Sequence, residues 1–318
     1  MIRQRCIFVL PAMKTIAPAV AASSVSWVGL RRRRGATSLR PRGAWRAILA
    51  ALIALVAVGL SATAAQAAIS PVAVIVMENK SYDTILGSSK APFINHTMIA
   101  GGTLSTQYHA NVPVSLRDYL AMTAGIVDSG QAPASENIFH QLQGAGHPWA
   151  EYEESMPSPC FTGASAGDAP GTSDPLYTAG HNPAIHFRNI KTQSALCKAH
   201  VLPYTSFTPS AMPEFSYIVP NQCNDMHSKC AGKDPVRAGD DWLAANVPAM
   251  VAAGATVILT WDESSGAQHV VTVTYGGGAP HGSDATSYTH FNLLAGLEQS
   301  YGVPAINGAI GKAPFPIP

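Results

Sequence analysis

Four side chains with oxygen ligands follow two apolar segments of the sequence, and together they could bind a divalent cation. Glu78 and Asn79 come directly after one segment, and Asp262 and Glu263 come directly after the other. Carboxylate and amide oxygens are typical ligands of Ca²⁺, Mg²⁺ and Mn²⁺, and neighbouring histidines would also admit zinc or iron. Acids after a strand are often ordinary loop or capping residues, and two such pairs in one chain weaken that alternative without removing it.

Ser115 is a candidate nucleophile at the start of a segment, residues 115–123, whose pattern predicts a helix. A serine there faces unpaired backbone N–H groups and the positive end of the helix dipole, which suits an incoming phosphate group. Asp118 follows three residues later, so Ser115 could instead be the capping residue of this helix. The residues alone favour the capping role.

The elements that must position these side chains alternate between strands and helices. Continuous apolar runs rich in β-branched residues predict buried strands at residues 71–77, 215–219, 255–261 and 270–275. Helices are predicted at residues 115–123, 240–253 and 292–301. This alternation indicates an α/β fold with a largely parallel sheet, in which ligands lie beyond the carboxyl ends of the strands. The stretch from Ser155 to Asp174 is rich in Pro, Gly, Ser and Ala and predicts a long surface loop held by Cys160.

The charge of the chain is divided unevenly between a leader and a body. Of the 20 Lys and Arg in this 318-residue chain, ten lie in residues 1–67, which contain no Asp or Glu. The body, residues 68–318, therefore has ten basic against 19 acidic side chains, a net charge near −9. An acidic body argues against nucleic acid as a partner, because phosphate backbones require Lys and Arg.

The leader has the pattern of a secretory signal peptide. An uncharged apolar run at residues 47–60 follows the basic part, and Ala65-Gln-Ala67 fits the small-residue cleavage rule. The alternative is a membrane anchor, but the run is shorter than the roughly 20 residues needed to span a bilayer. We therefore predict a signal peptide at residues 1–67, a mature protein in the cell envelope or outside the cell, and no stable membrane anchor after cleavage.

Cysteine usage agrees with export. Four cysteines lie in the body, namely Cys160, Cys197, Cys223 and Cys230, and they allow three disulfide pairings. Pairing Cys223 with Cys230 and Cys160 with Cys197 is favoured because each bridge closes a short loop. A metal site is disfavoured because no C-x-x-C spacing occurs.

Several motifs of the body carry a resemblance to a known family. They are Met77-Glu-Asn-Lys-Ser-Tyr-Asp83, Asn224-Asp-Met-His227, Trp261-Asp-Glu263 and Tyr288-Thr-His-Phe-Asn-Leu-Leu294. With these, the chain resembles the bacterial phosphoesterase family of secreted acid phosphatases and phospholipases C, within the alkaline phosphatase superfamily. The resemblance runs from about residue 72 to residue 302. It implies a three-layer α/β/α sandwich with a mostly parallel central sheet.

The resemblance also implies roles for individual residues. Glu78, Asn79, Asp262 and Glu263 match the family's metal ligands and imply one divalent metal ion, while Ser115 matches its nucleophile, which reverses the preference for a capping role. His227 matches a histidine that would bind phosphate or protonate the leaving group. Substrate contacts are expected from His109, Arg117, His269 and His290, although a lone histidine is as often structural. Three residues around the nucleophile depart from the family's pattern. The family usually has Pro in place of Val114, Pro in place of Arg117 and Asn in place of Asp118.

These inferences lead to a function. We expect an exported, metal-dependent hydrolase of small phosphomonoesters that acts through a phosphoserine. One alternative is a phosphodiesterase of the phospholipase C type, which the absence of an added lipid-binding module disfavours. The other is an extracellular binding protein that retains the fold without catalysis. Oligomeric state is not predicted.

Overall fold

The structure is a computed structural model that describes residues 70–318. The predicted signal peptide, with its cleavage after Ala67, lies outside the described residues. Among the helices in the described part of the chain, none is both long and apolar enough to cross a membrane.

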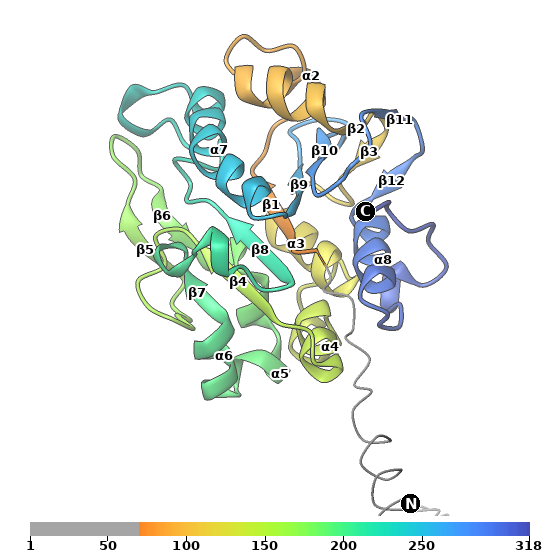
Figure 1. Ribbon diagram of the computed structural model, residues 1–318. Helices are drawn as coiled ribbons and strands as arrows, with labels where there is room; N and C mark the ends of the chain where they lie inside the picture. Colours follow the sequence, from red (N-terminus) through yellow and green to blue (C-terminus); the bar gives the residue numbers. More distant parts are fainter. Residues whose placement is uncertain (1–69) are drawn as a thin grey trace, which may run out of the picture. The chain divides into compact units, whose positions relative to one another are not determined.

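An eight-stranded sheet forms the centre of the described body (Figure 1). Its strands, in spatial order, are β11 (Gly282–Asp284), β2 (Thr103–Ser105), β10 (Thr272–Gly276), β9 (Thr256–Trp261), β1 (Val72–Met77), β8 (Phe215–Val219), β4 (Trp149–Glu153) and β7 (Val201–Pro203). Two small pairs lie outside it, β12 (Tyr288–Thr289) with β3 (Tyr108–His109), and β5 (Ser165–Asp168) with β6 (Pro175–Thr178).

Strand direction in the sheet is mostly parallel, as the sequence predicts. From β9 through β1, β8 and β4 to β7, all neighbouring strands are parallel, and β2 is parallel to β11. The exception is β10, which is antiparallel to both β9 and β2. Its apolar residues resemble those of the parallel strands because it too is buried inside the sheet, so composition alone could not reveal its direction.

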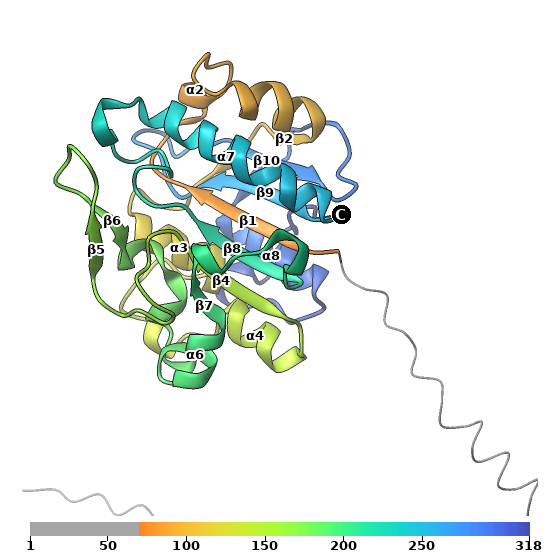
Figure 2. The same ribbon diagram turned by 60° about the vertical axis from the view of Figure 1, so that its left-hand side comes forward.

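Helices cover both faces of the sheet. They are α2 (Tyr82–Ile85), α3 (Ser115–Ala124), α4 (Ile138–Ala145), α5 (Arg188–Lys191), α6 (Ser194–His200), α7 (Pro235–Ala252) and α8 (His290–Ser300). Figure 2 shows α2 and α7 on one face and α4, α6 and α8 on the other. The short helical segments are η1 (Ile94–Ile99), η2 (Ala132–Ala134), η3 (Ala179–His181), η4 (Pro183–His186), η5 (Tyr204–Ser206), η6 (Pro209–Ala211), η7 (Cys230–Gly232) and η8 (Asn307–Ala309). The result is a three-layer α/β/α sandwich.

One helix boundary and one strand differ from the sequence-based expectation for reasons visible in the structure. Helix α7 begins at Pro235, five residues before the predicted start, because Asp234 caps its N-terminus through a bond from the Arg237 N–H and proline suits the first helical position. Asp240 is instead buried, and its carboxylate accepts hydrogen bonds from Phe93 and Ile94. Strand β4 was not predicted at all, since two glutamates interrupt its apolar pattern.

The stretch from Ser155 to Asp174 is not a loop throughout. It contains β5, which forms an antiparallel hairpin with β6. A disulfide between Cys160 and Cys197 joins this stretch to α6, and a second disulfide joins Cys223 to Cys230. Both are the pairings that loop length favoured.

Two buried carboxyls on β4 make stability depend on pH. Glu151 and Glu153 are 0% and 2% exposed and share one face of the strand, because they are two residues apart. Each has one oxygen without a hydrogen-bond partner in the described body, and burial raises the pKa of both carboxyls. The folded protein therefore retains protons that the unfolded chain releases above about pH 4.3. The free energy of unfolding should accordingly fall as the pH rises above that value.

Replacing one of these carboxyls should remove much of this pH dependence. We expect Glu151→Gln to raise the free energy of unfolding by on the order of 1–3 kcal/mol at pH 8 and by little at pH 5, because the amide is neutral at both. Urea denaturation at the two pH values measures this, with Asp168→Asn on exposed β5 as the control. A gain of equal size at both values would contradict the assignment.

Candidate functional site

The carboxyl ends of β1 and β9 bring three acids together. Met77 and Trp261 are paired in the parallel register of these neighbouring strands, so the residues that follow them emerge at the same edge of the sheet. One carboxylate oxygen each from Glu78, Asp262 and Glu263 lies within 4.8 Å of the others. The two acid-bearing strand ends of the sequence thus converge in a single cluster.

Ser115 directs its hydroxyl group at this cluster. It is the first residue of α3, and the residue at the capping position is Val114, so the alternative of Ser115 as a capping residue does not hold. The Ser115 Oγ lies 3.0 Å from Glu78 Oε1 and 3.0 Å from Glu263 Oε1. Because a hydroxyl has one hydrogen, it can satisfy only one of these oxygens at a time.

Asn79 contacts the acid cluster through its backbone and borders an adjoining cavity. Its backbone N–H donates to Asp262 Oδ1 at 3.1 Å, and its φ of 52° lies in the left-handed region that asparagine tolerates better than most residues. Asn79 lines a cavity of about 410 Å³ together with Glu263, Ser264 and Gln268. The Lys80 ammonium donates to the Asn79 carbonyl at 3.1 Å, and burial lowers its pKa.

The electrostatics of the cluster favour a bound cation. Burial and the neighbouring Asp262 raise the pKa of Glu78, and the same two causes raise the pKa of Glu263. In the described part of the chain, Glu78 Oε2 and Asp262 Oδ2 have no hydrogen-bond partner although both side chains are buried. A buried acid cluster with spare oxygens and an adjacent hydroxyl fits a hard divalent cation. Glu78, Asp262 and Glu263 would hold it, beside the Ser115 hydroxyl and next to Asn79, which the sequence predicts as a further ligand.

His181 is a site residue for which the sequence suggested no role. Its Nε2 lies 3.5 Å from Glu78 Oε2, and its Nδ1 lies 3.6 Å from Asp225 Oδ2. The ring stacks on Tyr119 of α3 at a centroid distance of 5.3 Å. No pattern in the sequence connects His181 to Glu78, which lies more than 100 positions earlier in the chain.

His290 has a different role from the predicted substrate contact. It is fully buried at the start of α8, with Nε2 at 2.6 Å from the Asp262 carbonyl and Nδ1 at 3.1 Å from the Tyr108 hydroxyl. Burial lowers its pKa to about 4, so the ring is neutral. Both nitrogens are used inside the protein, and His290 therefore holds the backbone of Asp262 in place of contacting a ligand. Asp118, 3.7 Å from Nε2, has a pKa raised to about 8 by burial.

His109 and His269 lie side by side at the edge of the site. Their rings stack at 4.8 Å, and His269 stacks on Tyr82 at 4.0 Å on its other face. The His269 Nε2 donates to the Thr106 carbonyl at 3.0 Å, and burial lowers the pKa of this imidazole. His269 thus supports the ring of His109, and His109 is the better placed of the two to meet a ligand.

The two remaining predicted residues lie on α3 and on the loop after β8. Arg117 is exposed in the first turn of α3, two residues beyond Ser115. His227 follows Asp225, whose side-chain Oδ1 accepts a bond from the His227 N–H at 2.7 Å and whose backbone carbonyl accepts one from the Glu78 N–H at 2.7 Å. The loop that carries His227 is thereby fastened to the loop that carries Glu78.

Comparison with known proteins places this site in a family. The model of the phosphoesterase family matches residues 93–306, more than half of the chain. The chain is 30% identical over 278 residues to a phosphatidylinositol-3-phosphatase of Mycobacterium tuberculosis, covering 81% of this chain and 85% of that protein. The chain belongs to the phosphoesterase family. It is accordingly a hydrolase that acts on phosphoric esters.

More distant relatives agree with this placement. A phosphate-repressible acid phosphatase of Penicillium chrysogenum is 25% identical, covering 64% of this chain but only 53% of that protein. Among solved structures, a protein of the alkaline phosphatase superfamily from Vibrio parahaemolyticus superposes with a TM-score of 0.53 at 10% identity, over 76% of this chain and 70% of that one. The fold is therefore that of the alkaline phosphatase superfamily.

Metal binding can be tested without measuring activity. Because a cation would relieve the repulsion among three carboxylates, adding Mn²⁺ or Mg²⁺ to chelator-treated protein should raise the melting temperature. The gain corresponds to about 2.7 kcal/mol when the metal is at 100 times its Kd. Asp262→Asn should remove most of this gain, and Asp128→Asn, an exposed acid away from the cluster, should not. Calorimetry that shows no metal-dependent shift in the unaltered protein would exclude the site.

Proposed function

We propose that this protein is an exported, metal-dependent phosphomonoesterase that acts through a phosphoserine at Ser115. The observation that carries the proposal is the Ser115 hydroxyl, 3.0 Å from two of three convergent carboxylates at the start of a helix. A nucleophile in that place attacks a phosphoryl group whose oxygens face the N-terminal end of α3, where the helix dipole is positive.

The chain's own residues account for the proton transfers. The Ser115 proton passes to a carboxylate that it already faces, and Glu263 is suited to accept it because it is the more exposed of the two. His227 gives a proton to the departing ester oxygen. Water then cleaves the phosphoserine, which releases phosphate and restores the hydroxyl. A divalent cation bound to the acid cluster would lower the hydroxyl's pKa and neutralise charge on the phosphoryl group.

Two further features support the finer parts of the proposal. The relatives named as phosphatidylinositol-3-phosphatase and acid phosphatase are, by those names, hydrolases of phosphomonoesters. Two disulfides in the described body fit a protein that folds outside the cytosol, which agrees with the predicted signal peptide.

Removing the Ser115 hydroxyl tests whether this group is needed for catalysis and not for folding. We expect Ser115→Ala to reduce turnover of p-nitrophenyl phosphate by at least about 10³-fold, because the nucleophile is lost. Melting temperature and metal affinity should change little. Ser194→Ala is a matched control, since Ser194 is also the first residue of a helix and is exposed. Acid quenching during turnover should trap phosphate on Ser115, and full activity of Ser115→Ala would show that another group attacks.

Substrate class is tested by comparing a monoester with a diester. We expect kcat/KM for p-nitrophenyl phosphate to exceed that for p-nitrophenylphosphorylcholine, because the proposed site binds a phosphoryl group with a single ester bond. Both rates should fall after treatment with a chelator. A preference for the choline diester would favour a phospholipase C type of activity.

A further inference from the structure

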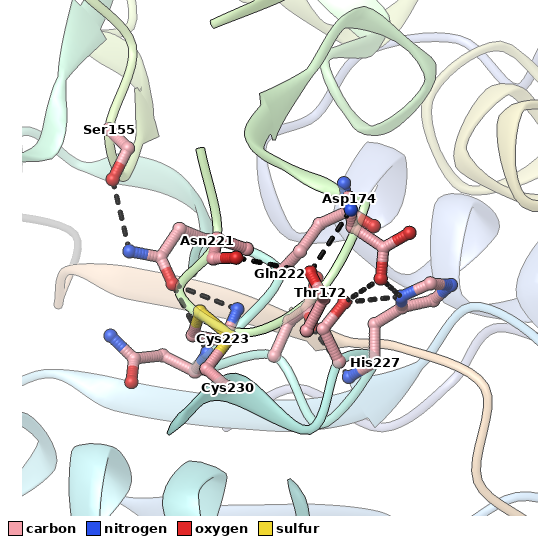
Figure 3. The surroundings of a disulfide bond; sticks show 12 residues. Ser155, Thr172, Asp174, Asn221, Gln222, Cys223, His227 and Cys230 are labelled. Carbon is pink, nitrogen blue, oxygen red and sulfur yellow. Dashed lines mark hydrogen bonds and ion pairs between the residues drawn. A yellow bond between two sulfur atoms is a disulfide. The ribbon is translucent and has the colours of Figure 1, made fainter. Parts of the chain in front are cut away.

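A hydroxyl group connects His227 to a carboxylate on a distant segment of the chain (Figure 3). The His227 Nδ1 lies 2.9 Å from Ser228 Oγ, and Ser228 Oγ donates to Asp174 Oδ2 at 2.6 Å. The direct distance from His227 Nδ1 to Asp174 Oδ2 is 3.8 Å. Both contacts with the serine are within hydrogen-bond distance, whereas the direct separation of the imidazole and the carboxylate is not, so the hydroxyl group bridges the two.

The hydrogens in this chain of contacts can be assigned. An ionised carboxylate only accepts hydrogen bonds, so the single hydroxyl hydrogen of Ser228 is directed at Asp174. Ser228 Oγ is then an acceptor toward the imidazole, which requires a hydrogen on His227 Nδ1. In the neutral ring, Nε2 is left as the nitrogen that gains and loses a proton.

Hydrogen bonds of its backbone hold Asp174 in position to accept the bond from Ser228. Its backbone N–H donates to Thr172 Oγ1 at 3.0 Å, and its carbonyl accepts from the Ala169 N–H at 3.0 Å, which closes the turn between β5 and β6. The same turn accepts a bond from the Ala231 N–H at 2.6 Å through the Pro170 carbonyl. The hairpin and the His227 loop are thus fastened to each other, and the Cys223–Cys230 disulfide restrains that loop.

We propose that Asp174 and Ser228 are positioning residues for His227. They hold its ring in one orientation, keep the hydrogen on Nδ1, and stabilise the imidazolium whose Nε2 proton is transferred to the ester oxygen. When the P–O bond breaks, that proton leaves with the alcohol and His227 is left neutral with its hydrogen on Nδ1. The use of His227 in turnover rests on the proposed function, whereas the state of its ring does not.

The charge around His227 sets the size of the effect. Two carboxylates face this residue, Asp174 through the serine and Asp225 through the backbone N–H. The side chains of His227 and Asp174 are 34% and 35% exposed, so water screens their attraction. Loss of the Asp174 charge should therefore act on His227 mainly through the hydrogen-bonded serine and only weakly through space.

The test of the ring state uses nitrogen-detected NMR of the imidazoles in the full protein. The His227 resonances are identified by their loss in His227→Gln. We expect the unaltered protein to show hydrogen on Nδ1, Asp174→Asn to weaken this preference, and Ser228→Ala to lose it. Asp168→Asn, on exposed β5 of the same hairpin, is the control and should match the unaltered protein. Hydrogen on Nε2 in the neutral ring, or the same Nδ1 preference in Asp174→Asn and Asp168→Asn, would overturn the proposal.

Kinetics with p-nitrophenyl phosphate provide the second readout. If the imidazolium donates the proton, Asp174→Asn should lower kcat more than it changes KM, because the ring is no longer held in one orientation. In the Ser228→Ala background, Asp174→Asn should have a smaller effect, because the bridge is already broken. An unchanged kcat beside an altered preference for Nδ1 in the NMR spectrum would contradict the role of His227 as the proton donor, which belongs to the proposed function, and would leave the positioning contacts established.

Discussion

Repulsion among Glu78, Asp262 and Glu263 is the constraint around which this end of the molecule is organised. Parallel pairing of β1 with β9 forces the residues after both strands to the same edge, so the acids cannot separate without shifting a central strand. Close carboxylates in a buried place raise one another's pKa unless a cation or hydrogen-bond donors compensate. The neighbouring elements can be understood by what they contribute to that compensation.

The surroundings supply hydrogen-bond donors to the acids, and the Lys80 ammonium adds a positive charge beside Asn79. Asn79 directs its backbone N–H at one oxygen of Asp262, and His290 holds the carbonyl of the same residue while staying neutral. His181 lies between Glu78 and Asp225 without reaching normal hydrogen-bond distance to either. These contacts fix the orientation of the acids and leave their net negative charge largely intact, which is the condition under which a divalent cation binds well.

Features with a continuous pattern could be predicted from the sequence, and features that depend on distant contacts could not. Strands β1 and β9 are uninterrupted apolar runs, so the convergence of the acids that follow them was foreseeable. Strand β4 could not be predicted because Glu151 and Glu153 are polar residues in a buried strand. Burial raises the pKa of both carboxyls, and a pattern of polar and apolar residues does not reveal such burial. The role of His290 could not be predicted for a similar reason, since the neighbouring residues give no sign that both ring nitrogens are used inside the protein.

Packing of Met226 against α7 stabilises a strained backbone conformation in the His227 loop. Met226 has a φ of 81°, a left-handed conformation that costs a non-glycine residue roughly 1–2 kcal/mol. The turn at Met226 directs the residues on its two sides into different environments. Asp225 is fully buried beside His181, and His227 is partly exposed. The Met226 side chain is itself fully buried, and a Cβ at Gly239 of α7 would lie 2.4 Å from its Cγ. Burial of a methionine contributes roughly 1.5–3 kcal/mol, enough to offset the backbone strain. Because Gly239 has no side chain, Met226 can be buried against α7. This burial holds Asp225 and His227 in their separate positions.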